Sequence, residues 1–298
     1  MKSRFLPVLA IFLMMPAMAP AQAPDASTRL AQARQLANGL TYQQGNITLK
    51  DNLATINLQP NFRYLDPAGT ETVLTKIWGN PPGKTPPLGM LVPAGFDPLG
   101  DDSWAVIISY DEDGHVNDDD AAKIDYNTLL AQMKEGVKES SAEREKQGYP
   151  SIELVGWAAQ PRYDAAAHKM YWAKEIKFGD ATEHTLNYNI RVLGRKGVLE
   201  LNAVAGMPQL AMVEKATPEI LSMVNFKDGS RYVDFNPSTD KLATYGLAAL
   251  VAGGIAAKAG LFKVVWVALL AAKKFVIMAF VAIAAFFKKM WAKIRGTQ

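Results

Sequence analysis

The residues that follow Asp240 constrain this chain most, because they are apolar and basic and include no acidic residue. The run Leu242–Leu261 contains a single charged side chain, Lys258. At about 1.5 Å per residue, a helix of that length crosses the ~30 Å hydrocarbon layer of a bilayer. The pattern predicts a transmembrane helix. The alternative is a helix buried in the core of the preceding domain.

Several small residues interrupt this apolar run. Glycines weaken a helix in water, but in lipid they allow two helices to approach closely. They therefore favour the membrane over a soluble core. The residues expected to face lipid or a neighbouring membrane helix are Leu242, Gly246, Leu250, Gly253 and Gly254.

The basic residues beyond the span leave two topologies open. Lys263, Lys274 and Lys288 fall near one face of a helix. This is typical of an amphipathic helix that lies in the interface and contacts anionic headgroups. One span followed by such a helix keeps the lysines in the cytoplasm, as the positive-inside rule prefers. A hairpin of two spans is the alternative, and pairing in a homo-oligomer would hide its lysines.

The N-terminus has the pattern of a secretory signal peptide. Lys2 and Arg4 precede a short apolar run, Phe5–Met15, and Ala21-Gln22-Ala23 is a cleavage site of small residues. Two prolines follow the run, which argues against an uncleaved anchor helix. We expect a bacterial inner-membrane protein with its soluble domain in the periplasm. The predicted parts are a signal peptide at 1–23, the domain at 24–239 and an anchor with a basic amphipathic tail at 240–298.

The central region predicts an α+β domain with a mostly antiparallel sheet and packed helices. Alternating apolar residues over Ile152–Val204 indicate a meander with one buried face, with a turn expected at Pro161–Asp164. Helical periodicity predicts helices at Tyr126–Lys146 and at about Pro208–Val224. Thr70 is the expected N-cap of a shorter helix. Strand-rich runs with separate helices are typical of α+β folds.

Composition excludes several kinds of site. The chain has no cysteine, so it has no disulfide, thiol nucleophile or cysteine-ligated metal. Its three histidines, His115, His168 and His184, stand outside any metal-ligand spacing. No nucleophile elbow, phosphate-binding loop or dinucleotide fingerprint is present. We therefore expect no cofactor, and a non-enzymatic role is favoured over an enzymatic one.

One strand carries the best candidates for a ligand or partner face. Asn187, Asn189 and Arg191 alternate with apolar residues and so share one side of that strand. Such a stripe can line a cleft or contact a partner, and the solvated side of a half-exposed sheet has the same pattern. Arg195, in the turn Gly194–Gly197, adds a second cation that could bind an anion. The alternative is a solvated hairpin tip.

An acidic stretch nearly matches a calcium loop. Asp111, Asp113, Asn117 and Asp120 occupy positions at which such a loop supplies oxygen ligands. The first position is Ser109, however, and the last lacks the usual glutamate. The alternative is a turn that leads into an acidic helix start.

A set of short stretches distributed over nearly all of the mature chain carries a resemblance to a known family. These stretches are Trp78–Pro82, Asp113–Val116, Asp118–Ala121, Gly156-Trp157, Pro161, Tyr163-Asp164, Leu186–Asn189, Leu193–Arg195 and Tyr245–Ala249. As a set they resemble a family of bacterial membrane-anchored proteins classified as domain of unknown function 2167. The resemblance implies an exported, membrane-anchored protein without an assigned activity, and the order of elements is similar to the PsbP/Mog1-like layout.

Three functional hypotheses follow. The first is a non-enzymatic envelope protein whose domain binds a protein or a small ligand. The second is an accessory subunit of a transporter or channel that oligomerises through its C-terminal helices. The third is a hydrolase, which requires Asp111, Asp113 and His115 to meet in one cleft. The apolar residues among the C-terminal lysines favour lipid headgroups over nucleic acid as their partner.

Overall fold

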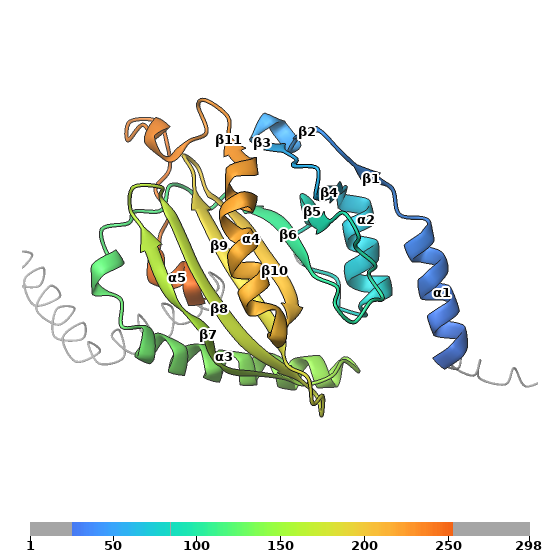
Figure 1. The fold of residues 1–298 in the computed structure, drawn as a ribbon. Coiled ribbons are helices and arrows are strands. Elements are labelled where there is room, and N and C mark those ends of the chain that lie inside the picture. Colours follow the sequence, from blue (N-terminus) through green and yellow to red (C-terminus); the bar gives the residue numbers. More distant parts are fainter. Residues whose placement is uncertain (1–25, 84, 253–298) are drawn as a thin grey trace, which may run out of the picture.

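The computed structural model describes residues 26–83 and 85–252, which form five α-helices and eleven strands (Figure 1). The helices are α1 (Ala26–Asn38), α2 (Pro67–Glu71, continued by a π-helical turn at Thr72–Ile77), α3 (Tyr126–Lys146), α4 (Leu210–Met223) and α5 (Leu247–Ala252). The strands are β1 (Tyr42–Gln43), β2 (Asn46–Thr48), β3 (Ala54–Asn57), β4 (Phe62–Leu65), β5 (Gly89–Pro93), β6 (Ala105–Asp111), β7 (Ile152–Asp164), β8 (Lys169–Phe178), β9 (Thr185–Leu193), β10 (Val198–Gly206) and β11 (Val224–Phe226).

The strands form one large and one small sheet. The large sheet has the order β1-β4-β5-β6-β10-β9-β8-β7, and the small one the order β11-β3-β2. Every paired strand within them is antiparallel. The prediction of an α+β domain with a mostly antiparallel sheet is confirmed.

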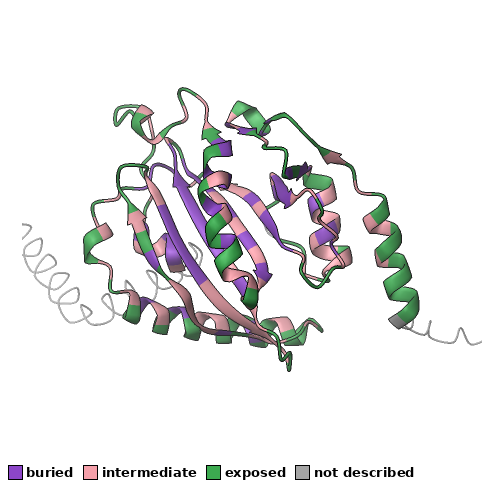
Figure 2. Cartoon of the chain, viewed as in Figure 1, coloured by how far each residue is buried: buried purple, intermediate pink, exposed green. Residues whose placement is uncertain are grey.

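Helices cover both faces of the large sheet (Figure 1). On one face α4 packs against the apolar residues of β9 and β10, where Tyr188, Ile190 and Leu201 are buried. On the other face α3 and α5 cover the end near Met170, and α2 with its π-helical turn covers the end near Met90. The strands between them are the most deeply buried part of the chain (Figure 2).

The structure corrects two local predictions. The N-cap of α2 is Asp66 rather than Thr70, because Asp66 precedes a proline and its Oδ1 accepts from Gly69 N at 2.8 Å. The turn expected at Pro161–Asp164 does not occur there. Instead β7 continues through Asp164, and its antiparallel pairing with β8 shifts register at three places. These bulges accommodate the proline on an edge strand.

The helix predicted to begin at Leu242 begins at Leu247. Leu242, which is 54% exposed, pairs with His115 as a short parallel bridge. Asp120 stops a helix from starting earlier, because its Oδ1 accepts from Leu247 N at 3.1 Å. A side chain at Gly246 would place Cβ 2.4 Å from Asp120 Oδ2. The first part of the predicted span is therefore extended chain on the domain.

Helix α5 packs in the core of the domain. Leu247, Leu250 and Val251 are at most 3% exposed and pack with α3 and the sheet. No helix within residues 26–83 and 85–252 combines the length and apolar character that crossing a bilayer requires. Gly253, Gly254, Lys263, Lys274 and Lys288 lie outside the described residues, as does the predicted signal peptide.

Candidate functional site

The predicted stripe on β9 belongs to a larger polar face that spans four neighbouring strands. Strand register places Trp172 opposite Asn189, and Asn189 opposite Asn202. Lys174 lies opposite Asn187 in the same way. These side chains lie on the side of the sheet away from α4, because residues in a strand alternate between faces. We define the polar face as Ser109, Trp172, Lys174, Asn187, Asn189, Arg191, Glu200 and Asn202.

Arg191 is the centre of a bonded group on this face. Its Nε forms an ion pair with Glu200 Oε1 at 2.9 Å, without the geometry of a hydrogen bond, and its guanidinium lies 5.0 Å from the centre of the Trp172 ring. Ser109 Oγ donates to the other Glu200 oxygen at 3.2 Å. Burial lowers the pKa of Arg191, while the Glu200 carboxylate opposes that shift. The arginine is therefore fixed and neutralised within the sheet.

Other polar groups on this face have no such partner. Among the described residues, none forms a hydrogen bond or ion pair with the Lys174 ammonium, and burial lowers the pKa of Lys174 to about 8. Trp172 Nε1 and Asn202 Oδ1 are buried and also unpaired there. Unmet donors and acceptors of this kind are uncommon in protein interiors.

Burial changes how the predicted partner face can work. Asn189 is 3% exposed and Arg191 is 8% exposed. Asn189 donates to Asn187 O at 2.8 Å, so its amide is already engaged in the sheet. A protein surface cannot reach side chains this deep.

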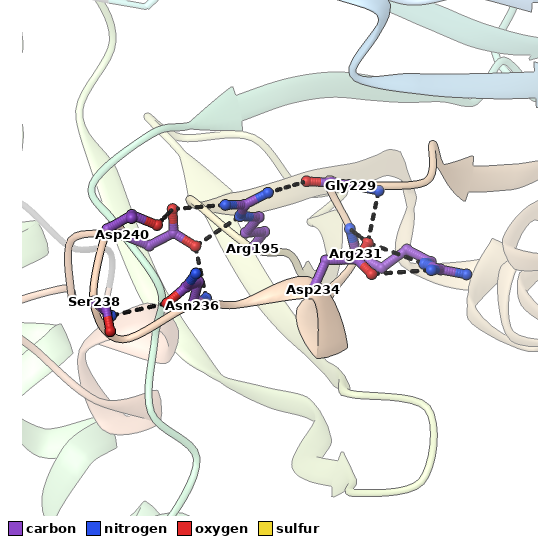
Figure 3. Close-up of polar contacts among 8 residues, drawn as sticks. Arg195, Gly229, Arg231, Asp234, Asn236, Ser238 and Asp240 are labelled. Carbon is purple, nitrogen blue, oxygen red and sulfur yellow. Dashed lines mark hydrogen bonds and ion pairs between the residues drawn. The ribbon is translucent and has the colours of Figure 1, made fainter.

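Arg195 does not join this face. It lies beyond β9, where Nε and Nη2 donate to Asp240 at 2.6 and 3.0 Å (Figure 3). Nη1 donates to Gly229 O at 3.2 Å. The arginine predicted as an anion site therefore attaches the β9–β10 turn to the segment before α5.

The predicted calcium ligands do not converge. Asn117 Oδ1 accepts from Asp119 N at 2.7 Å, and Asp120 binds the start of α5. Within the described chain no group of three His, Asp or Glu side chains could hold a metal ion. Asp111 and Asp113 thus lie in no such group, and the geometry adds no support for the calcium loop.

A second cluster, of aromatic and ionisable side chains, surrounds Tyr232. Tyr232 OH donates to Asp118 Oδ1 at 3.1 Å, and Tyr163 OH donates to its other oxygen. His168 stacks on Tyr232 at 4.0 Å between ring centres, and His115 stacks on Phe235 at 4.0 Å. Burial lowers the pKa of His115. No local sequence pattern indicated this cluster, because its members come from three separate segments.

Two of the hollows on the surface of the described domain bear on ligand binding. The larger, of about 720 Å³, lies between the β5–β6 loop and the start of α4; the smaller is about 380 Å³. Neither is lined by Asp111, Asp113 or His115, the residues on which the hydrolase hypothesis depends. We call the larger one the acidic hollow. It is lined by Pro93, Gly95, Phe96, Asp97, Gly100, Asp101, Asp102, Ser103, Trp104, Pro208, Gln209 and Met212.

The loop that lines the acidic hollow is fixed at several points. Asp97 Oδ1 accepts from Leu99 N at 3.0 Å, and Asp97 Oδ2 pairs with Arg34 of α1 at 2.7 Å. The arginine holds the pKa of Asp97 below its usual range. Gln209 Nε2 donates to Asp102 O at 2.7 Å, and Trp78 Nε1 to Pro98 O at 2.9 Å. The hollow is therefore formed before anything binds.

A family model for a protein of unknown function, DUF2167, matches residues 41–284. The chain belongs to the DUF2167 family. Two of the matching stretches, Asp118–Ala121 and Tyr245–Ala249, meet at the start of α5 in this DUF2167 protein, where Asp120 Oδ1 accepts from Leu247 N. No curated protein matches the chain in sequence.

Three solved structures are similar to part of this DUF2167 protein. Cyanobacterial PsbP (CyanoP) from Synechocystis sp. PCC 6803 is 13% identical, with a TM-score of 0.33, over 63% of this chain and 94% of its own. The Ran-binding protein Mog1p of Saccharomyces cerevisiae is 10% identical, with a TM-score of 0.31, over 63% and 96%. A mutant of protein Mog1 is 10% identical, with a TM-score of 0.32, over 62% and 96%. These values do not establish a shared function.

Proposed function

We propose that this DUF2167 protein is a non-enzymatic binding module of the bacterial inner membrane. Its domain faces the periplasm, and its acidic hollow binds a cationic, partly apolar segment of an envelope protein. The observation that carries the proposal is the chemistry of this hollow. Three carboxylates line it, from Asp97, Asp101 and Asp102, and none of its lining residues is Lys or Arg.

Charge favours a cationic partner. Arg34 neutralises Asp97 from outside the hollow, whereas Asp101 and Asp102 are exposed and have no ion pair with a described residue. Complementary charge raises the association rate and excludes acidic partners. Two lysines or arginines of a partner can therefore pair with these two carboxylates.

Apolar side chains beside the carboxylates favour a peptide segment over a free metal ion or small amine. Phe96, Trp104 and Met212 line the hollow, and Met212 is 44% exposed. Methionine adapts to varied apolar partners. Because the loop is already fixed, binding costs little ordering entropy.

The proposed location comes from the sequence at both ends of the chain. A signal-peptide pattern precedes residue 24, and the chain after Ala252 is basic and free of acidic residues. Since residues 242–252 belong to the domain, any anchor begins later than Leu242. A reporter enzyme that works only outside the cytoplasm, fused after Ala252, should be active. Activity only from a cytoplasmic reporter would reverse the proposed orientation.

The binding proposal can be tested with synthetic peptides. A peptide of alternating Lys and Leu should bind the full-length protein, and its Glu–Leu counterpart should not. The double change Asp101→Asn with Asp102→Asn should weaken binding by about tenfold or more, since charge pairs at such an interface contribute about 1.5 kcal/mol or more. Added salt should weaken binding of the peptide to the wild type more than its binding to this double variant, because salt screens the charge pairs.

The control removes two equally exposed carboxylates elsewhere. The control variant combines Asp180→Asn with Glu183→Gln. Both residues lie in the β8–β9 turn, outside the hollow. This variant should bind the cationic peptide as the wild type does. Equal affinity for both double variants would show that the hollow is not the site.

A further inference from the structure

We infer that the polar face binds a small anion, a carboxylate or a phosphate, that also carries a hydroxyl or amino hydrogen. Three unpaired groups define the site: the Lys174 ammonium, the Trp172 indole N–H and the Asn202 carbonyl oxygen. The first two are donors and the third is an acceptor. A single small molecule with both kinds of group can satisfy all three.

The strand register brings these groups together. Lys174 and Trp172 are two residues apart on β8, so they share a face about 7 Å apart along the strand. Trp172 lies opposite Asn189, and Asn189 lies opposite Asn202. Opposed Cβ atoms lie about 4.5–5.5 Å apart, so the Cβ atoms of Trp172 and Asn202, two strands apart, are separated by about 9–11 Å, and those of Lys174 and Asn202 by about 12 Å. The long side chains of Lys174 and Trp172 shorten the gap that a ligand of a few heavy atoms has to bridge.

The charge balance points to an anion. Arg191 is neutralised by Glu200 at 2.9 Å, but Lys174 has no carboxylate in contact among the residues described. An unpaired ammonium in a desolvated place is unfavourable, and an anion beside it removes the penalty. The burial that lowers the pKa of Lys174 to about 8 agrees with this environment.

The depth of the face selects a small ligand over a macromolecule. Trp172, Asn189 and Arg191 form a buried floor, at 1%, 3% and 8% exposed. Lys174 and Asn202 are partly exposed above it. A molecule can therefore enter past Lys174, whereas a protein surface would touch only the upper side chains. Ordered water is the competing occupant, since water also bridges unpaired buried groups.

The test is a calorimetric titration of the full-length protein with acetate, lactate or inorganic phosphate, each at the same ionic strength. At pH 7, lactate or phosphate should bind with a dissociation constant of about 1 mM or lower. Binding should weaken above about pH 9, because Lys174 is neutral there. Lactate should bind more tightly than acetate, because only lactate has a hydroxyl for Asn202. Preference for phosphate or for lactate identifies the anion class.

Two variants locate the binding. Lys174→Met should lower the affinity by about tenfold or more, and Asn202→Leu should remove the advantage of lactate over acetate. Lys177→Met is the matched control, because Lys177 lies on the same strand but on the opposite face. It should leave affinity unchanged. An affinity for Lys174→Met within about twofold of wild type would overturn the inference.

A second measurement does not depend on a folded variant. The pKa of Lys174 can be followed by NMR of the wild type with methyl-labelled lysines. Saturating anion should raise this pKa, since an anion favours the charged amine. An unchanged pKa with no binding of any of the three anions up to about 20 mM would show that only water occupies the face.

Discussion

Arg195 binds Asp240 through two hydrogen bonds, although 45 residues separate them in the sequence. The pair joins the β9–β10 turn to the segment that leads into α5 (Figure 3). Asp240 also accepts from Asn236 N at 2.8 Å, and its side chain is only 3% exposed. A bidentate pair of this kind fixes orientation as well as distance. It is one of three attachments that hold residues 240–247 on the domain.

Removing this pair should lower thermal stability and change its pH dependence. Arg195 lowers the pKa of Asp240 to about 2, below the value near 4 of an unfolded aspartate. The stabilisation is therefore complete above about pH 4 and is lost as the pH falls toward 2. Asp240→Asn should lower the melting temperature by about 2–6 °C at pH 7 and flatten its decline in acid. Asp228→Asn, at a carboxylate that is 92% exposed, is the control and should do neither.

The second attachment depends on Gly114. This residue has a φ of +115°, and a Cβ there would lie 2.8 Å from Lys241 O and 2.9 Å from Ala243 N. Those are backbone atoms of the bridge between His115 and Leu242, so they cannot move aside. Gly114→Ala should cost about 2–4 kcal/mol in chemical denaturation.

Gly136 provides the matched control for that change. It lies inside α3, and a Cβ there would meet no atom within 4 Å. Gly136→Ala should stabilise the protein by about 0.5–1 kcal/mol, because alanine loses less backbone entropy in a helix. Similar losses in both variants would contradict the proposed role of the bridge.

The assignment of α5 to the core makes a further prediction. Leu247 is 0% exposed and packs with α3 and the sheet, whereas Leu242 is 54% exposed. Leu247→Ala should therefore destabilise the domain by about 2–5 kcal/mol. Leu242→Ala should change stability by no more than about 0.5 kcal/mol. Equal small effects of both changes would favour a helix that lies outside the core.

Protonation of His115 should destabilise the fold. Burial lowers its pKa below 6.5, against smaller opposing contributions from nearby backbone and from Asp118. The unfolded chain then binds the proton more readily, so stability falls as the pH drops below about 6.5. His115→Phe keeps the stack with Phe235 and should flatten stability between about pH 5 and 7.

The groups that face His115 decide how this result is interpreted. Asp118 and Tyr232 lie on one side, and His168 adds a second imidazole, which stacks on Tyr232. His184→Gln is the control, since His184 lies elsewhere and contacts Glu175 at 2.6 Å. If His184→Gln removed the pH dependence and His115→Phe did not, His115 would not be the responsible group.

Local patterns were enough to predict much of the fold. Helix α3 has the predicted bounds, because Asp125 caps its first amides and the apolar residues repeat with helical spacing. The strands of the meander were found from their alternation, apart from the extent of β7. Strands β1, β4 and β11 were not predicted, since two to four residues carry too little periodic pattern.

The sequence by itself determined which residues share the face of β9, because alternation is a local property of the backbone. Only the tertiary structure decided how deep Asn189 and Arg191 lie, and that Lys174 and Asn202 join them from other strands. It also decided that Leu247–Ala252 packs in the domain. An apolar run is equally suited to lipid and to a protein core, and only long-range contacts such as that of Asp120 with Leu247 select between them.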